Sequence, residues 1–234
     1  MFSTREELLK ELFSFEDEER ADFNAKICGG KRKHLGVRIP VLRKIAKRET
    51  AIGTERFLSV LGDEYYEEAM LRGIAVMGAK IPFNEKEKAI FDYIPYVDNW
   101  ALVDSPAATL KIRPKEENEY LLLVEDLIAD DREFAVRIAF VILLDYYVKE
   151  EFLEYIFSTA DNVPAERYNV SMAVAWLISV CAAKYPVQTE NYLKRTKIDD
   201  LTYNRAVRKI CDSFRADKQY KERLKLTRRK ISSK

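Results

Sequence analysis

The sequence contains few of the residues that break regular structure, with 7 glycines and 7 prolines among 234 residues. A chain with so few turn formers favours helices. Glycine motifs that bind phosphate are also missing, because Gly29-Gly30-Lys31 has neither the rest of a P-loop nor a preceding strand. The scarcity of glycine therefore argues against a nucleotide-binding α/β fold.

The sequence also has few metal-binding or nucleophilic side chains. His34 is the single histidine, which excludes a Ser-His-Asp triad and an HExxH zinc helix. Cys28, Cys181 and Cys211 are odd in number and far apart, so neither a disulfide framework nor a Cys/His zinc cluster is expected. Any chemistry must use carboxylate, arginine and aromatic groups, and we expect no metal and no cofactor.

Long apolar runs and a strong net charge are absent as well. No run approaches the roughly 18 residues that span a bilayer, and the segment 1–7 is acidic and amphipathic rather than a signal sequence. We therefore expect a cytoplasmic protein without membrane contact, a monomer that forms a single domain over residues 1–234. The formal net charge of +1 does not identify a partner.

Helical periodicity recurs along the chain, and no stretch alternates like a convincing strand. Pairs of amphipathic helices repeat in units of roughly 30 to 45 residues, which is typical of stacked HEAT-like repeats. We predict an all-α chain whose helices cover 17–27, 41–48, 55–61, 65–80, 85–94, 116–129, 133–147, 150–157, 165–184, 189–194, 201–214 and 218–229, after a first helix capped by Ser3 or Thr4. A compact helical bundle is the alternative architecture.

Basic residues gather in three places. The glycine-broken loop 28–36 carries Lys31, Arg32 and Lys33, and the helix after Pro40 has Arg43, Lys44, Lys47 and Arg48 on one face. A basic tail covers about 223–234 and is expected to fray. The loop and the helix are candidates for phosphate binding, although a basic helical face can also simply be solvated.

The segment 96–105 sets Trp100 four residues before Asp104. On a helix that spacing places both side chains on one face. An indole beside an ionised carboxylate suits a sugar on which positive charge develops. The competing interpretation is structural, because most tryptophans pack in cores and Asp98, Asn99, Asp104 and Ser105 are good N-cap residues.

Two further residues stand out in the second half of the chain. Arg137 lies among apolar residues and needs a partner or an opening to solvent. Trp176 is the second tryptophan, on another apolar helix.

Four of these landmarks, in order and spacing, resemble the HEAT-like repeat DNA alkylation repair proteins, the AlkD-type alkylpurine DNA glycosylases. They are the segments 36–47 and 97–104, the Arg137 helix and the Trp176 helix. The resemblance implies a curved, right-handed solenoid whose concave face takes double-stranded DNA. It also implies hydrolysis of the N-glycosidic bond of N-alkylated purines.

The resemblance also implies roles for individual residues. Asp104 would be the catalytic carboxylate, Trp100 and Trp176 would pack against the deoxyribose and backbone, and Arg137 would hold a phosphate. The cations expected nearest the DNA backbone are Arg38, Arg43, Lys44 and Lys47, followed by Lys31, Arg32 and Lys33, with solvent exposure as the alternative. Because the alkylated base already carries positive charge, it needs no general acid, and we expect no deep nucleobase pocket.

Three departures from the family pattern leave a second hypothesis open. The region that matches the family's damage-recognition helix, 25–34, contains Ile27 and the Gly29-Gly30 break, as in a subgroup without clear glycosylase activity. Ser171 and Met172 stand where a polar or basic contact residue is usual, and Pro106 could kink the Asp104 helix. The alternative is a catalytically silent HEAT-like protein that binds nucleic acid structures or a protein partner. In a third interpretation both tryptophans are plain core residues.

Overall fold

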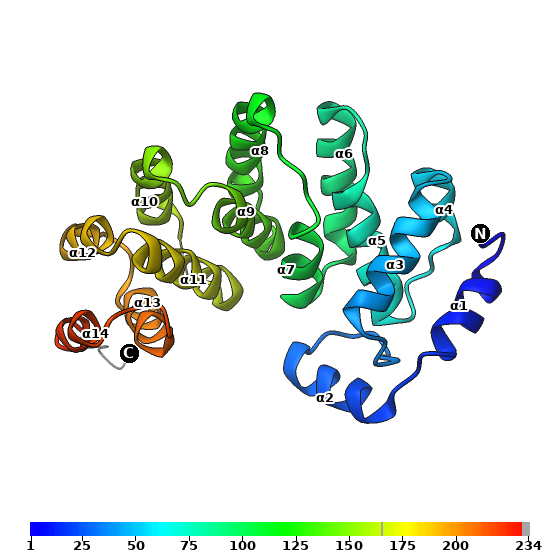
Figure 1. Cartoon of the computed structure of the whole chain (residues 1–234), viewed down its shortest axis with the longest axis horizontal. Coiled ribbons are helices and arrows are strands. Elements are labelled where there is room, and N and C mark those ends of the chain that lie inside the picture. Colours follow the sequence, from blue (N-terminus) through cyan, green and yellow to red (C-terminus); the bar gives the residue numbers. More distant parts are fainter. Residues whose placement is uncertain (165, 231–234) are drawn as a thin grey trace. The chain divides into compact units, whose positions relative to one another are not determined.

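The computed structural model describes residues 1–164 and 166–230, and its regular structure in them is helical (Figure 1). An isolated bridge between Lys33 and Tyr65 is the one β-type pairing among these residues. The all-α prediction is confirmed. By its internal contacts the chain divides into two compact units, Met1–Leu123 and Val124–Lys234.

The first unit begins with two helices and continues with a layered set. Its helices are α1 Arg5–Phe13, α2 Glu18–Cys28, α3 Ile39–Thr50, α4 Thr54–Val60, α5 Tyr66–Gly78, α6 Phe83–Tyr93 and α7 Ala101–Ala107, with 3-10 turns at Ile94–Tyr96 and Pro114–Glu116. Helix α5 packs between α3 and α7, while α4 and α6 cover it from the other side. Nearly every residue of α5 is buried, so this helix forms the core of the unit.

The second unit repeats the same arrangement. Helix α8, Glu117–Ala129, crosses the boundary between the units, and it is followed by α9 Glu133–Tyr146, a 3-10 turn Glu150–Phe152, α10 Leu153–Asn162, α11 Tyr168–Lys184, α12 Pro186–Arg195, α13 Asp200–Asp212 and α14 Lys218–Lys225. Helix α11 packs between α9 and α13, and α12 and α14 pack on α11 and α13. Phe157 of α10 stacks on Tyr192 of α12 with ring centroids 4.1 Å apart. Successive helix pairs thus stack within the unit, as the repeat prediction requires; the curvature and handedness of the solenoid stay predictions.

Buried carboxylates fix the loops of the first unit. Glu67 accepts hydrogen bonds from the backbone N–H groups of 35–37 at 2.9 to 3.2 Å, which ties the loop before α3 to α5. Glu68 accepts from Arg5 and from three backbone N–H groups at the start of α5. Glu49 binds Arg48, Arg56 and the N-terminal residues. Buried carboxylates persist only when they are hydrogen-bonded in this way.

The end of α5 is completed by a lysine. The Lys86 ammonium is buried and donates to the carbonyls of Val76, Met77 and Ala79 at 2.5 to 3.0 Å. The last turn of a helix leaves most of its carbonyls without a helical donor. The Ala79 N–H reaches the Val76 carbonyl at 3.3 Å, and Lys86 is a side-chain donor to all three carbonyls. Lys86 of α6 therefore joins the two layers of the unit.

The predicted helix boundaries needed correction at the C-terminal end. Helix α12 begins at Pro186 rather than residue 189, because proline is favoured in the first turn. Helix α14 ends at Lys225, and Arg229 is held by the carbonyls of Thr196 and Ile198 and by Asp200. Within the predicted tail Arg229 is therefore held by hydrogen bonds to the rest of its unit, and residues 231–234 of that tail lie outside the described residues.

Two features absent from the described residues bear on membrane and metal contact. No helix among them is both long and apolar enough to cross a membrane. No group of three or more His, Cys, Asp or Glu side chains in this part of the chain could hold a metal ion.

Candidate functional site

Helix α7 carries the tryptophan and the carboxylate that the sequence singled out. Trp100 is its N-cap residue, and the Asp104 N–H donates to the Trp100 carbonyl at 3.0 Å. One helical turn therefore separates the two side chains, and both are half-buried. Trp100 is thus not a plain core residue.

The start of α7 is set by Asn99. Its buried side-chain oxygen accepts from the N–H groups of Ala101 and Leu102 at 3.1 and 3.3 Å. This satisfies two of the donors that the first turn of a helix leaves unpaired. Asn99 thus has the capping role expected from its residue type, and it fixes the backbone that carries Trp100.

The end of α7 is shaped by Pro106, which lies inside the helix. Proline has no N–H, so the Leu102 carbonyl loses its helical donor. The hydroxyl of Tyr93 donates to that carbonyl instead, at 2.6 Å. Gly73 of α5 makes room for this arrangement, because a Cβ there would lie 2.5 Å from the Tyr93 oxygen and 2.6 Å from the Pro106 ring.

A third contact holds α7 from the side of α3. The guanidinium of Arg43 donates to the Ser105 carbonyl at 2.9 Å, next to Asp104 in the chain. Arg43 is half-buried, whereas its neighbours Lys44 and Lys47 are exposed. The structure thus gives Arg43 a positioning contact that the sequence did not predict.

The Gly29-Gly30 break packs directly against the segment before Trp100. Gly30 adopts a φ of +98°, and a Cβ on it would lie 2.9 Å from Asp98 Oδ1. The Lys31 N–H donates to Asp98 Oδ2 at 2.9 Å. Gly30 therefore allows the loop to approach Asp98 more closely than a residue with a side chain could.

The three cations of this loop have different environments. The Arg32 side chain is only 10% exposed and forms ion pairs with Asp63 and with Asp98. Lys33 pairs with Glu64 at 3.0 Å, and Lys31 is exposed. Arg32 is therefore a structural link between the loop, the start of α5 and the start of α7, whereas Lys31 and Lys33 are exposed.

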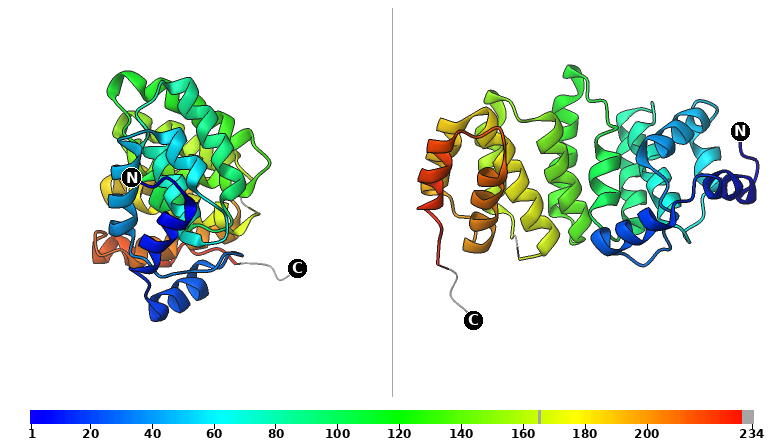
Figure 2. Two further views of the ribbon diagram at one scale, coloured as in Figure 1. Left: turned by 90° about the vertical axis from the view of Figure 1, so that its right-hand side faces the viewer. Right: turned by 60° about the horizontal axis from the view of Figure 1, so that its bottom comes forward.

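Helix α2 ends inside the region 25–34, where the resemblance places the damage-recognition element, and most of the helix precedes that region. The helix has no buried residue, and it projects from the body of its unit (Figure 2). Phe23 and Ile27, one turn apart on it, are 61% and 51% exposed. The Trp100 indole N–H donates to the Ile27 carbonyl at 3.4 Å, so this apolar surface adjoins Trp100. The helix agrees with the one predicted over 17–27, but the sequence analysis did not anticipate the exposure of Phe23, which precedes the region 25–34.

Arg137 of α9, in the second unit, is buried, with 5% of the residue exposed. Its guanidinium donates to the Asn169 carbonyl at the start of α11 at 2.9 Å, while Glu133 accepts from the Asn169 N–H at 2.8 Å. These contacts supply the partner that a buried arginine needs, and they join α9 to α11.

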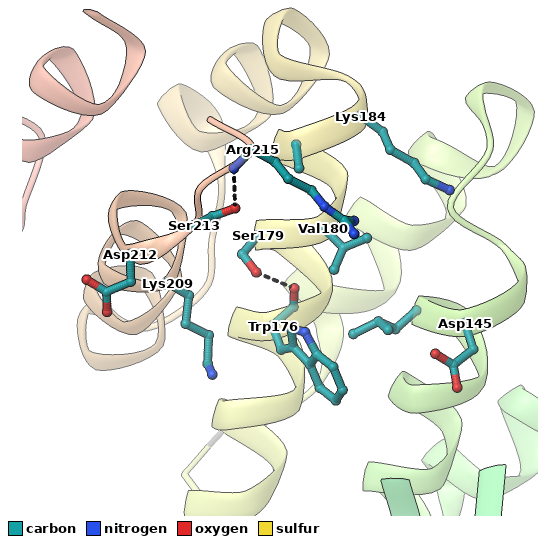
Figure 3. A pocket seen from close by; sticks show the side chains of 11 residues that line it. Asp145, Trp176, Ser179, Val180, Lys184, Lys209, Asp212, Ser213 and Arg215 are labelled. Carbon is teal, nitrogen blue, oxygen red and sulfur yellow. Dashed lines mark hydrogen bonds between the residues drawn. The ribbon is translucent and has the colours of Figure 1, made fainter. Parts of the chain in front are cut away.

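Trp176 of α11 is half-buried and lines an open cavity of about 680 Å³ (Figure 3). The other cavity residues come from the ends of α9, α11 and α13 and from the turn after α13; they are Leu144, Asp145, Ser179, Val180, Ala183, Lys184, Lys209, Asp212, Ser213 and Arg215. Trp176 is therefore accessible at a concave surface, and the plain core interpretation fails for it as well.

Ser171 and Met172 stand where the family pattern has a polar contact. Ser171 is buried, shares a 2.6 Å hydrogen bond with Thr202 and accepts from Arg205 of α13 at 2.6 Å. Arg205 also lies over the Tyr168 ring, 4.9 Å from its centroid. A cation from the neighbouring helix thus lies near Ser171, and its position depends on packing between α11 and α13.

The accessible site residues therefore form two groups, one in each unit. Trp100, Asp104, Lys31 and the exposed face of α2 belong to the first unit, and the Trp176 cavity belongs to the second. Arg38, Lys44 and Lys47 are exposed at or on α3. The sequence analysis missed Phe23, Lys209 and Arg215, because exposed phenylalanines and isolated cations carry no distinctive spacing.

The chain matches a model of a known protein family. No curated protein sequence matches the chain. A family model described as DNA alkylation repair enzyme matches residues 8–225, and so covers α7, Arg137 and Trp176. The chain belongs to the DNA alkylation repair enzyme family.

Proposed function

We propose that this protein is a DNA glycosylase that hydrolyses the N-glycosidic bond of N-alkylated purines in double-stranded DNA. The observation that carries the proposal is the pairing of Trp100 and Asp104 on one face of α7, in a chain of this repair family. Three side chains from other elements, Tyr93, Asn99 and Arg43, bind the backbone of α7. Such preorganisation is what electrostatic catalysis requires.

The chemistry needs little more than a positioned carboxylate. An N-alkylated purine is cationic, so the glycosidic electron pair leaves with the base and no acid is needed. The sugar is left as an oxocarbenium-like cation, which the Asp104 carboxylate stabilises. Water then adds to the anomeric carbon and loses a proton to the carboxylate, which gives an abasic site and the free base. The Trp100 indole offers an apolar face to the sugar.

Phe23 and Ile27 support this proposal over the silent alternative. They expose an apolar helix surface that adjoins Trp100 through the Ile27 carbonyl. The Gly29-Gly30 break motivated the silent alternative, but the loop at these glycines packs against Asp98, in the segment before α7. This loop therefore forms part of the surroundings of α7.

The remaining assignments are separate parts of the proposal. Trp176 would pack against the DNA backbone, Arg137 would act on a phosphate, and the exposed Arg38, Lys44, Lys47 and Lys31 would contribute backbone contacts. Asn169 binds Arg137 in the described structure, so a phosphate would share this guanidinium with a carbonyl. Each assignment is tested by its own variant.

The deciding experiment measures free base released from a duplex that contains N-alkylated purines. Wild type should release base, and Asp104→Asn should be slower by about 10²- to 10³-fold, the usual effect of removing one preorganised electrostatic group. Asp92→Asn is the matched control, because Asp92 is an exposed carboxylate on α6. Circular dichroism and thermal unfolding verify that each variant is folded.

The outcomes separate the two hypotheses. Release by wild type and Asp92→Asn but not by Asp104→Asn supports the glycosylase. Absence of release from folded wild type, with retained binding to DNA or to a protein, supports the catalytically silent HEAT-like protein. Equal release by wild type and Asp104→Asn would remove Asp104 from the mechanism.

A further inference from the structure

His34 lies where the loop after α2 meets the start of α5. Its ring stacks on the ring of Tyr66, the first residue of α5, with centroids 4.5 Å apart and planes inclined by 15°. On one side of His34, the Tyr66 N–H donates to the Lys33 carbonyl at 2.8 Å. On the other side, the Leu35 N–H donates to the buried Glu67 carboxylate at 3.1 Å. The half-buried imidazole is therefore held in one place against α5.

The nitrogen Nδ1 of this imidazole is shielded from solvent and has no hydrogen-bond partner among the described residues. A neutral imidazole can keep Nδ1 without a proton, so that the atom is only an unpaired acceptor. An imidazolium carries a proton on both nitrogens and would leave a buried donor unpaired, which costs free energy. The neutral ring is therefore the form that fits this position.

The groups around the ring act on its charge in both directions. Burial has the largest effect and lowers the pKa of His34 below 6.5, although the Gly29 carbonyl and the Asp98 carboxylate act to raise it. The titratable and charged groups that face the stacked rings from α2, the loop, α5 and the segment before α7 are Cys28, Arg32, Tyr66, Glu67 and Asp98. The Asp98 carboxylate is already paired with Arg32 at 3.0 Å, so it does not serve the imidazole alone.

Helix α2 ends beside this ring. Gly29 is its C-cap residue, and the Gly29 carbonyl acts on the imidazole. Two residues earlier, the Ile27 carbonyl accepts from the Trp100 indole at 3.4 Å. No residue of α2 is buried, so little apolar burial opposes its local detachment from the unit. The position of the Trp100 indole therefore depends on contacts at the end of α2, and His34 supplies one of them.

We infer that His34 is a positioning residue: as a neutral imidazole it holds the end of α2 in place, and its protonation releases α2 and the Trp100 indole. The inference rests on the proposed function only in the role that this function gives to Trp100. Because the pKa of His34 is lowered while α2 is docked, docking is strongest above pH 6.5 and weakens as the pH falls from 6.5 through the lowered pKa.

The test follows Trp100 in the Trp176→Phe variant, in which it is the single tryptophan. Quenching of its fluorescence by acrylamide, which is neutral, is measured from pH 8 to about pH 5.5, above the ordinary range of carboxyl groups. The quenching constant should rise in one step with a midpoint below pH 6.5. His34 is the single histidine, so its proton NMR signals give its titration directly, and the two midpoints should coincide.

His34→Phe, made in the same variant, keeps a flat ring beside Tyr66 but cannot titrate. Its quenching should stay at the low value over the whole pH range, whereas His34→Ala lacks the ring and should be quenched more strongly at every pH. Trp100→Phe is the matched control, because it leaves Trp176 of the second unit as the reporter, and its quenching should not follow the titration. An undiminished step in His34→Phe, the same step at Trp176, no step at Trp100, or midpoints that differ would each overturn the inference.

Base release distinguishes this inference from the proposed function. The rate of release by the wild type, divided by that of His34→Phe, should fall as the pH falls below 6.5. A quenching step that coincides with the His34 titration, in a protein that releases no base, would leave the positioning role standing and reject the glycosylase. Base release with quenching that does not change with pH would support the glycosylase and reject the role of His34.

Discussion

The Tyr93 hydroxyl donates a 2.6 Å hydrogen bond to the Leu102 carbonyl, the acceptor that Pro106 leaves without a helical donor. A proline inside a helix usually costs stability and bends the helix. Here a buried tyrosine from α6 replaces the missing N–H, so the turn that carries Asp104 keeps its hydrogen bonds.

Tyr93→Phe should lower the free energy of unfolding by about 1–3 kcal/mol, because a buried carbonyl then has no donor. The variant should also release base more slowly, since α7 loses one of its supports. Chemical denaturation gives the stability, and the release assay described above gives the rate.

Tyr220→Phe is the control for this prediction. The Tyr220 hydroxyl is buried and has no hydrogen-bond partner among the described residues. Its removal should be neutral or stabilising. Equal destabilisation by both variants would show that the loss comes from packing rather than from the Leu102 carbonyl.

Gly30→Ala should disturb the start of α7. The new Cβ would lie 2.9 Å from Asp98 Oδ1, and the residue would keep a φ of +98°, which alanine rarely adopts. We expect a loss of about 1–3 kcal/mol in unfolding free energy, of the size usual for a residue held in a strained backbone conformation, together with slower base release.

Gly29→Ala separates the steric effect from backbone strain. Gly29 also has a positive φ, of +67°, but a Cβ there would meet no atom within 4 Å. It should therefore lose stability with little effect on base release. Similar losses of activity in both variants would contradict the proposed contact between Gly30 and Asp98.

Arg43→Met and Lys44→Met should differ although the residues are neighbours. Arg43 binds the Ser105 carbonyl, so its loss should slow base release and leave the salt dependence of DNA binding unchanged. Lys44 is exposed, and as a phosphate contact its loss should make the salt slope shallower by about 0.9. A shallower salt slope in Arg43→Met, with slower base release in Lys44→Met, would instead show that Arg43 binds phosphate.

Glu68 should make the free energy of unfolding depend on pH in the acid range. Burial acts to raise the pKa of this carboxyl, but the Arg5 guanidinium and the N–H groups of Tyr65 and Gly62 outweigh burial and hold the pKa below 4.5. A lowered carboxyl pKa stabilises the folded state above the unfolded value of 4.5, and this contribution is lost as pH falls through the lowered pKa. Glu68→Gln should therefore be less stable at neutral pH and approach the wild type as the pH falls.

Glu67→Gln tests a pH dependence of stability that is opposite to that of Glu68. Burial raises the pKa of Glu67 above 4.5 despite its backbone donors. As the pH falls, the Glu67 carboxyl is therefore protonated in the folded protein at a higher pH than in the unfolded chain. Its contribution to stability grows as pH falls through the raised pKa toward 4.5. Unfolding curves measured from pH 7 to pH 3 should separate the two variants, and parallel curves for both would contradict these assignments.

Local features of the fold could be predicted from sequence. Helical periodicity gave the all-α class and most helix positions, and the four-residue spacing placed Trp100 and Asp104 one turn apart. Asn99 was recognisable as a capping residue. These features depend on the 3.6-residue repeat and on hydrogen bonds between near neighbours, so the local sequence is sufficient.

The sequence could not show which charged groups are free to meet a ligand. Lys31, Arg32 and Lys33 are equivalent in a basic run, yet Arg32 alone is enclosed by two carboxylates. Arg43 finds its acceptor 62 residues away, on another helix. The exposure of Phe23 and the grouping of Lys209 and Arg215 with Trp176 likewise arise only when helices pack.

By itself the sequence determined the helices, their repetition in pairs and the register of Asp104 with Trp100, because those follow from short-range backbone geometry. The tertiary structure decided which cations are structural links and which line an accessible surface. Helix packing brings a carbonyl or carboxylate to one arginine and leaves its neighbour facing water, and no local pattern records that difference.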